Sequence, residues 1–501
     1  MARAVPPDHN AAMTRRTWLP DPSHYPEQMT PLSATVWFEA VGLGLHAAAR
    51  ELRAPFGGFE ARTEGGWAYE AELDPDWRPD ADVMRSAALA VATRWDEELR
   101  ERVWQITREL WQLRPELPPP DEAVTMLDRT WELVREQWTL HFLVVLPAQA
   151  AAEIFNERYV ELHGSGDPLA AYRLLEAPRP EHELVLLARQ AKEHRLDHLI
   201  RDLPVEHALA RLRGLALGRA WLRRLDGYLD PLGGMGGRAR WHELSLPREA
   251  ELPEMTLAAI RLYLDHEPPE PRAREPVPAD LEEIHAACAA AFALKETHTY
   301  DIDYPGLLAT REVLIGFGRR LAAEGLLDEA ADVWFLTREE LRTALAEPGD
   351  PRAAVSTHRA EAARGLVQGP APYLGDAPAA GRQRDATLEK FYGAGGRALA
   401  GAGASPGIAE GPARIVARPE DFARVEPGDV LVAATTTPAW TPLFGSVAAL
   451  VTETGGVLSH AAVVAREYRI PAVVGATGAT TAIPEGARVR VDGGTGEVTL
   501  I

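Results

Sequence analysis

One segment of the sequence holds the residue types that phosphate chemistry needs. It runs from Thr452 to Glu467 and reads TETGGVLSHAAVVARE. Gly455 and Gly456 follow an apolar run, and a helical pattern then begins whose first turn carries Ser459 and His460. Two glycines let the backbone approach an anion closely, and a helix N-terminus offers unpaired N–H groups and a partial positive charge. The pattern predicts an anion site with a histidine beside it.

His460 is the side chain of this segment that could itself carry a phosphoryl group. Imidazole is nucleophilic near neutral pH without a strong base, because its unperturbed pKa is about 6.5. A phosphoryl group formed there would meet the donors of the helix start. The alternative is a solvent-exposed histidine after an ordinary turn, the commoner case for an isolated histidine. The preceding Gly-Gly-x-x-Ser sequence favours the phosphate site.

The elements that must position this histidine are short and rich in valine. Six runs bounded by Gly and Pro predict β-strands at residues 413–418, 429–433, 447–453, 472–475, 487–492 and 497–501. Shorter helical patterns, including Ser459–Glu467, lie between them. A glycine-rich stretch precedes them. We therefore expect a small mixed domain over residues 403–501, attached through a flexible hinge at 393–402.

The sequence before the hinge is mainly helical in pattern, from about Met84 to Leu366. Between Met84 and Leu113 an apolar stripe at three- and four-residue spacing comprises Leu89, Val91, Trp95, Leu99, Val103, Ile106 and Leu110. Capping signatures at 280–283 and 337–340 predict two helix starts. We expect an α+β multidomain protein with a mixed lead-in over residues 1–80 and a helical body over 81–392.

Composition limits the function classes. The 501 residues include 53 basic and 74 acidic side chains, and the formal net charge of -21 argues against nucleic-acid or anionic-membrane partners. A single cysteine, Cys288, excludes a disulfide framework and a cysteine-rich zinc site, and no metal site is predicted. The N-terminus lacks the apolar core of a signal peptide, and the most apolar run, 141–155, is shorter than the roughly 20 residues of a membrane span. We expect a cytoplasmic protein.

The segment around His460 resembles the phosphohistidine signature of the PEP-utilising enzymes, the family of pyruvate phosphate dikinase, PEP synthase and rifampin phosphotransferase. The similarity extends across residues 403–501 through the motifs ASPGIAEG at 404–411, GDVLVA at 428–433, TTTPAW at 435–440, IPAVVG at 470–475 and VDGGTG at 491–496. The resemblance implies a swivelling β/β/α phosphohistidine domain in which His460 carries the phosphoryl group.

The same resemblance implies a set of residues that cradle the phosphate: Thr454, Gly455, Gly456, Ser459, Thr436 and Thr437. For the last two threonines, a helix cap before Pro438 is an equally good interpretation.

The helical body is similar, at residues 18–32 and 304–341, to the acceptor-binding domain of rifampin-phosphotransferase-like members. In those relatives this domain binds the alcohol that receives phosphate. The candidate acceptor-binding residues are Lys295, Glu296, His298, Tyr300, Asp301 and Asp303. They could supply a base for an acceptor hydroxyl, and the other interpretation is a solvated helix end and loop. Rifampin phosphorylators carry Arg-Glu-x-x-Lys near this position, whereas this chain has KETHT at 295–299, so rifampin is not expected as the substrate.

Two parts of the family's larger enzymes are not expected in this sequence. Only 17 residues precede Trp18, no Walker-type loop is found, and the sequence ends nine residues after Asp492. Neither an ATP-grasp domain nor a barrel for PEP or pyruvate is therefore expected. The resemblance implies a phosphotransferase component whose His460 receives phosphate from a separate ATP-grasp subunit, which would use ATP and Mg²⁺ that this chain does not itself bind, and passes it to a small organic hydroxyl acceptor.

Two other functions stay open. One is a catalytically inactive small-molecule-binding or regulatory relative that lost its ATP domain. The intact Gly-Gly-x-x-Ser-His sequence disfavours it, because a binding module does not need that histidine. The other is a plain phosphocarrier, for which the long helical body would be unnecessary.

Overall fold

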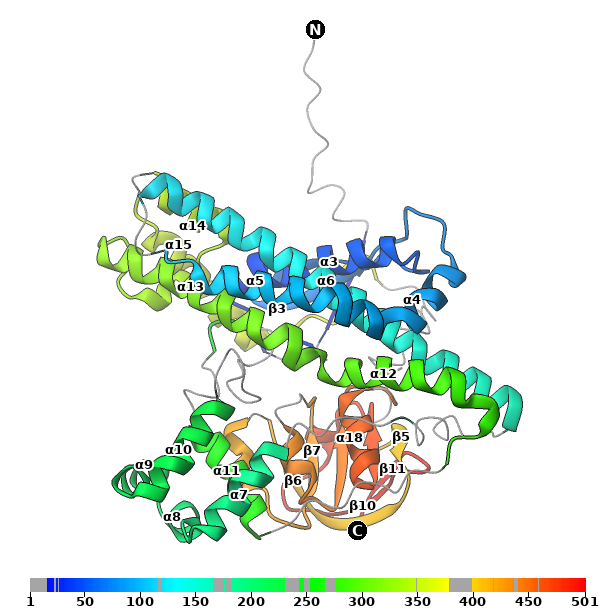
Figure 1. Ribbon diagram of the computed structural model, residues 1–501. Helices are drawn as coiled ribbons and strands as arrows, with labels where there is room; N and C mark the ends of the chain where they lie inside the picture. Colours follow the sequence, from blue (N-terminus) through cyan, green and yellow to red (C-terminus); the bar gives the residue numbers. More distant parts are fainter. Residues whose placement is uncertain are drawn as a thin grey trace. The chain divides into compact units, whose positions relative to one another are not determined.

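A computed structural model describes residues 16–21, 24–25, 27–115, 119–164, 175, 182–229, 243–246, 253–265, 276–347, 349–377, 399–417, 419–436, 440–457 and 459–501. The chain forms two compact units, whose elements are drawn in Figure 1. Unit 1 comprises residues within 1–155, 242–245 and 286–382, and unit 2 comprises residues within 156–241, 246–285 and 383–501.

Unit 1 is mainly helical. Its helices include α3 (Glu39–Glu51), α4 (Ala81–Arg94), α5 (Arg100–Gln112), most of α6 (Pro120–His163), the later part of α12 (Glu282–His298), α13 (Tyr304–Ala323), α14 (Arg338–Ala346) and α15 (Arg352–Gln368). The π-helical turn η2 (Trp95–Leu99) joins α4 to α5, so the helix predicted over 84–113 is confirmed as one helical segment. Six residues of its apolar stripe are buried, whereas Leu89 is 38% exposed. Helix α13 packs against α5.

A small antiparallel sheet completes unit 1. Its strands β1 (Thr17–Pro20), β2 (Phe59–Glu64), β3 (Trp67–Glu72) and β4 (Leu374–Gly375) lie in the order β2-β3-β1-β4. Gly65 and Gly66 form the two-residue turn of the β2–β3 hairpin, and both have positive φ, which glycine adopts without a Cβ clash. The pairing of β1 with β4 joins segments more than 350 residues apart, so sequence periodicity could not have predicted this sheet.

Unit 2 contains a helical group that the sequence analysis placed in the helical body. Helices α7 (His182–Glu193), α8 (Asp197–Asp202), α9 (Val205–Gly214), α10 (Ala216–Tyr228) and α11 (Pro253–Asp265) share a buried core that includes Trp221. Helix α11 also packs against η8 (Pro419–Arg424) and α17 (Thr441–Phe444) of the C-terminal domain. The functional division into an acceptor-binding body and a carrier domain stays a prediction.

The C-terminal domain is built on a seven-stranded sheet of order β11-β10-β6-β7-β8-β9-β5. Its strands are β5 (Ala402–Ser405), β6 (Ile408–Ile415), β7 (Val430–Ala433), β8 (Ala449–Thr452), β9 (Ala472–Val474), β10 (Arg488–Asp492) and β11 (Glu497–Leu500). Strands β6 to β9 pair in parallel, and the outer pairs are antiparallel. The α+β multidomain class is thus confirmed. Strand β6 begins earlier than expected, and β5 was not predicted.

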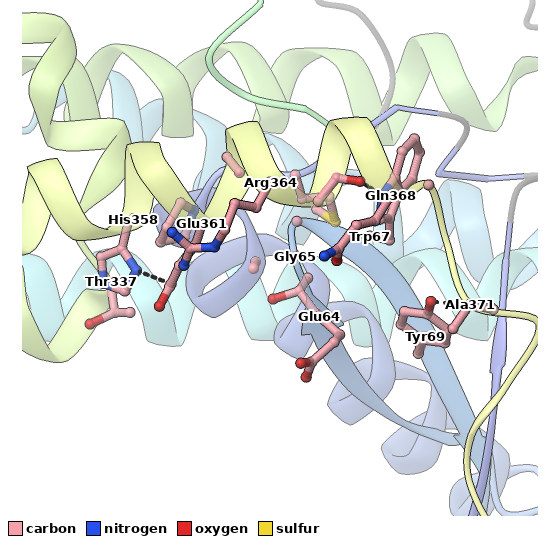
Figure 2. Close-up of a pocket in the computed structure, with 18 of the residues that line it drawn as sticks. Glu64, Gly65, Trp67, Tyr69, Thr337, His358, Glu361, Arg364, Gln368 and Ala371 are labelled. Atoms are coloured by element: carbon pink, nitrogen blue, oxygen red, sulfur yellow. Dashed lines mark hydrogen bonds and ion pairs between the residues drawn. The ribbon is translucent and has the colours of Figure 1, made fainter.

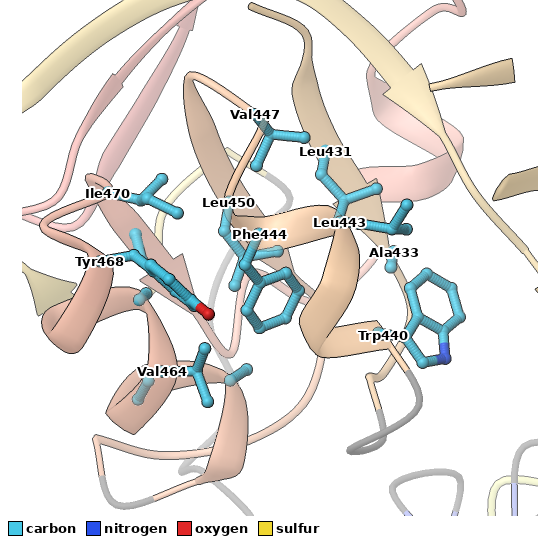
Figure 3. Packing of buried hydrophobic residues seen from close by; sticks show 14 of the residues in the cluster. Leu431, Ala433, Trp440, Leu443, Phe444, Val447, Leu450, Val464, Tyr468 and Ile470 are labelled. Atoms are coloured by element: carbon cyan, nitrogen blue, oxygen red, sulfur yellow. The ribbon is translucent and has the colours of Figure 1, made fainter. Parts of the chain in front are cut away.

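The central strands of this sheet are covered on both faces, which explains their continuous valine runs. Along β7 and β8, Leu431 and Leu450 point into one core with Phe444 and Tyr468 (Figure 3). The alternating Val430, Val432, Ala449 and Val451 lie in a second core with Ala479 and Ile483. Strands buried on both faces give a firm base to the Gly455–Gly456 turn, which follows β8.

Two helical segments have the length and composition of a membrane span. They are Pro31–Glu51 and Glu122–His163, and 72% and 67% of their most apolar windows are buried inside the protein. The apolar run at 141–155 is therefore part of a longer helix, which corrects the expectation that no segment reaches that length. Burial of this extent is typical of the core helices of a folded body.

Candidate functional site

His460 is the first residue of helix α18 (His460–Tyr468), as the sequence pattern predicts. Ser459 is the N-cap residue, with the extended backbone of φ -63° and ψ 156°, and its Oγ accepts a hydrogen bond from the Ala462 N–H at 3.4 Å. The imidazole is half-buried. The ring therefore belongs to the first turn of a helix, whose dipole places a partial positive charge that stabilises an anion.

The turn before α18 requires glycine at one position. Gly455 has φ +95°, and a Cβ added to it would lie 3.0 Å from the Ser459 Oγ. The next residue, Gly456, accepts a hydrogen bond from the Ser459 N–H through its carbonyl at 2.9 Å. The turn is thus folded tightly against the capping serine, which places His460 directly after it.

Thr441 is a site residue that the sequence analysis missed. Its Oγ1 lies 3.0 Å from the His460 Nε2, at hydrogen-bond distance, and the threonine is only 1% exposed. It begins the short helix α17, which packs against α18. The only signal in the sequence is its place just after the TTTPAW motif, because the hydrogen bond is decided by the packing of α17 on α18. This bond holds the imidazole in one orientation.

The predicted phosphate-cradle threonines have different surroundings. The Thr454 Oγ1 donates a hydrogen bond to the Ala434 carbonyl at 3.1 Å, so it braces the loop in the structure described. The Thr436 Oγ1 is buried and has no hydrogen-bond partner among the described residues. Thr437 and the glycine-rich hinge at residues 393–398 lie outside the described residues. The cradle roles stay predictions.

The predicted acceptor-binding residues lie inside unit 1, where α12 continues through the π-helical turn η6 (Thr299–Asp303) into α13. Lys295 is 9% exposed and Glu296 is 6% exposed, so the alternative of a solvated helix end is wrong. The Lys295 Nζ lies 2.6 Å from the Glu296 Oε1 in a buried ion pair. Burial also raises the pKa of Asp301. The Tyr300 ring lies edge-on to Tyr304 at 5.7 Å between centroids.

His298 and Asp303 meet a third polar residue, His141 of α6, which the sequence analysis did not single out. The His141 Nδ1 lies 2.6 Å from the Asp303 Oδ1, and the His298 Nε2 lies 3.6 Å from the Asp303 Oδ2. Burial lowers the pKa of His298 to about 4, so its imidazole is neutral at pH 7. No local pattern marks His141, because it lies in an apolar helix 162 residues from Asp303.

Unit 1 also contains a cavity of about 560 Å³ between the β2–β3 hairpin and helix α15 (Figure 2). Polar side chains gather along its α15 side: His358, Glu361, Arg364 and Gln368. None of the six candidate acceptor-binding residues lines it: Lys295, Glu296, His298, Tyr300, Asp301 and Asp303. The cavity and the buried polar cluster are therefore separate features of the unit.

Comparison with known protein families gives a match over residues 425–496, to the PEP-utilising enzyme mobile domain. The matched residues include Thr441, the Gly455–Gly456 turn and His460. The C-terminal domain is a PEP-utilising mobile domain. The geometry of the mobile domain agrees with that assignment, because its histidine starts a helix after a glycine turn.

Three relatives place the chain in a wider context. Chondramide synthase cmdD of Chondromyces crocatus is 29% identical over 97% of this chain, which corresponds to 14% of the relative. The uncharacterised phosphotransferase YvkC of Bacillus subtilis is 37% identical over 42% of this chain and 26% of the relative. The rifampicin phosphotransferase of Bacillus cereus is 50% identical over 21% of this chain and 12% of the relative. The chain thus spans about a quarter or less of the length of each of these relatives.

Proposed function

We propose that this chain is a phosphotransferase component whose His460 carries a phosphoryl group from an ATP-grasp component to a hydroxyl of a small organic acceptor. The observation that supports this most directly is the position of His460, at the first residue of α18 and within 3.0 Å of the Thr441 hydroxyl. The ATP-grasp component is a separate subunit in this proposal, it uses ATP and Mg²⁺, and the reaction is cytoplasmic.

The first transfer forms an N–P bond at His460. A ring nitrogen attacks the phosphorus, the P–O bond to the donor breaks, and the ring proton is lost to solvent. The charge of the phosphoryl group then lies near the N-terminus of α18, whose dipole stabilises it without reorganisation. Thr441 orients the ring for the attack.

The second transfer breaks that bond. The acceptor loses its hydroxyl proton, its oxygen attacks the phosphorus, and the imidazole leaves with its electron pair. In the proposal the acceptor binds at Lys295, Glu296, His298, Tyr300 and Asp301 of unit 1. The burial of Lys295 and Glu296 supports this role, because charges act more strongly in a low-dielectric site. A carrier domain on a hinge would let one histidine serve both reactions in turn.

The test is labelling with ATP that carries ³²P at the β or the γ position, in the presence of Mg²⁺. The purified chain is incubated alone and with extract of its native host, and acid-labile, alkali-stable label is measured. We expect label on the wild type only with extract, and none on His460→Ala. His163→Ala is the matched control, because His163 pairs with Asp280 in the same unit and should leave labelling unchanged.

Two results would contradict parts of the proposal. Label on the chain without extract would show an ATP site within these 501 residues and refute the separate subunit. An absence of label beside a positive control, a known kinase of this family, would refute the carrier role of His460.

A further inference from the structure

We propose that unit 1 holds a binding site for one divalent transition-metal ion of the zinc type, formed by His141, His298 and Asp303. The three side chains come from α6, α12 and η6, and one ligand atom from each lies within 4.8 Å of the others. All three are largely buried: the exposed fractions of their side chains are 8%, 17% and 2%. The cluster shares His298 with the proposed acceptor-binding residues, but metal binding can be measured without phosphoryl transfer.

The spacing of these atoms suits a small ion. Zinc binds His nitrogen at about 2.0–2.1 Å and carboxylate oxygen at about 2.0–2.2 Å, so neighbouring ligands of a tetrahedral ion lie about 3.4 Å apart. The His298 Nε2 and Asp303 Oδ2 lie 3.6 Å apart. The His141 Nδ1 and Asp303 Oδ1 lie 2.6 Å apart, and this hydrogen bond would open by a small rotation as the ion replaces its proton.

Two lone pairs in this cluster face each other. The His298 Nδ1 lies within hydrogen-bond distance of the Lys295 carbonyl, which can only accept, so the ring proton is on Nδ1. The Nε2 lone pair is thus directed to the cluster, where the Thr299 hydroxyl approaches it only at 3.4 Å. Opposite it, the Asp303 Oδ2 is buried with no hydrogen-bond partner among the described residues. A cation between these two buried acceptors, which lie 3.6 Å apart, would be stabilised by both.

The surroundings of the cluster are typical of a metal site. A backbone carbonyl that receives the second ring N–H, as at His298, is a common second-sphere partner of metal-ligating histidines. Around His141, the rings of Trp138 and Phe142 lie at 4.7 and 4.6 Å between centroids and exclude water. Two carboxylates, Asp303 and Glu296, lie here with a single ammonium group, that of Lys295, so the cluster can take up a dication.

The donor set indicates which ions bind. Two imidazoles and one carboxylate suit Zn²⁺ and its first-row neighbours, whereas Mg²⁺ prefers oxygen ligands alone. Three protein ligands leave at least one coordination position open, as in catalytic rather than structural zinc sites. An oxygen of a small ligand could occupy that position.

The experiment uses the full chain, purified without a polyhistidine tag and stripped with a chelator. Calorimetric titration with Zn²⁺ should give one saturable site per chain. Titration with Co²⁺ should give the intense visible absorption bands of a four- or five-coordinate ion. His141→Ala and Asp303→Asn should each weaken binding at least about 10–100-fold, the loss that even outer-sphere changes cause.

His24→Ala is the matched control. His24 pairs with Asp21 at 2.7 Å in the same unit, so this variant removes a histidine–aspartate pair of the same kind outside the cluster, and metal binding should persist. Asp303→Asn keeps the shape of the side chain, so it serves as the test variant if His141→Ala does not fold. Circular dichroism checks that Asp303→Asn is folded.

Three outcomes would overturn the site: no saturable Zn²⁺ binding by the wild type, the weak absorption of octahedral Co²⁺, or full affinity in both cluster variants. Because binding is measured without ATP, a failure here leaves the phosphoryl-carrier proposal untouched. A failure of His460 labelling likewise says nothing against the metal site.

Discussion

At the scale of single residues, the ring of His460 is held by contacts with its neighbours. The imidazole is half-buried, the Ser459 cap precedes it, and the Thr441 Oγ1 lies 3.0 Å from its Nε2. A free histidine would rotate and exchange its ring proton between both nitrogens. One threonine from a neighbouring helix therefore restricts the orientation of the ring.

Replacing Thr441 with Val tests this contact. Valine keeps the shape of the buried threonine but removes the hydroxyl, so the fold should persist while the His460 ring loses its fixed partner. A net hydrogen bond of about 1 kcal/mol corresponds to an about five-fold change in the ratio of the two imidazole tautomers. Nitrogen-15 NMR of the His460 side chain measures that ratio.

Ser446→Ala is the control for this variant. The Ser446 Oγ donates a hydrogen bond to the Leu443 carbonyl at 2.9 Å beside the same short helix, without a bond to His460. The tautomer ratio should match the wild type in Ser446→Ala. An unchanged ratio in Thr441→Val would show that the hydroxyl does not hold the ring.

At the scale of elements, the β8–turn–α18 segment works as a unit. Strand β8 lies between β7 and β9 in the sheet and pairs in parallel with both. The Gly455–Gly456 turn therefore lies at the carboxyl end of these parallel strands. Gly455 folds the turn back on Ser459, and the helix starts at once. The turn must be compact for the helix start to face the same side as Thr441.

Gly455→Ala should destabilise the domain for two reasons. An alanine at φ +95° costs about 1–2 kcal/mol of folding free energy, and its Cβ would also press on the Ser459 Oγ at 3.0 Å. Gly428→Ala isolates the first cost, because Gly428 has φ +89° with nothing within 4 Å of the added Cβ.

Urea denaturation followed by circular dichroism measures both losses. The loss of unfolding free energy should be larger for Gly455→Ala than for Gly428→Ala. Equal losses would mean that the contact with Ser459 does not constrain the turn.

At the scale of the whole molecule, the chain passes between its two units several times. Unit 1 takes residues from three separate ranges of the sequence. The chain passes from unit 1 to unit 2 within α6, after Phe155, and returns to unit 1 within α12, at Ala286. Cys288 lies in the part of α12 that belongs to unit 1 and is fully buried. It is the single cysteine of the sequence, so its reactivity reports on this unit alone.

Thiol labelling of Cys288 should therefore require the opening of unit 1. Burial raises the pKa of the Cys288 thiol to about 11, so little thiolate exists at pH 8, and the side chain is 0% exposed. We expect reaction with Ellman's reagent to be at least about 100-fold slower in the native protein than in urea. Native labelling at the rate of a free thiol would contradict the burial of α12 described here.

Local sequence patterns were sufficient to predict much of the mobile domain. Valine runs bounded by glycine and proline determined its central strands, because parallel strands buried on both faces need continuous apolar residues. The Gly-Gly turn, the capping Ser459 and the helix start at His460 lie within six residues, and each depends on backbone preferences that act over such distances.

Only the tertiary structure decided which distant residues meet. Thr441 reaches His460 because α17 packs on α18, and His141 reaches Asp303 across 162 residues of sequence. The burial of Lys295 and Glu296 likewise follows from the π-helical turn that joins α12 to α13 without a loop. Hydrogen bonds act over about 3 Å in space and produce no periodic pattern along the sequence. The sequence alone therefore determined the helices and strands, whereas tertiary packing determined the contacts of His460 and of Asp303.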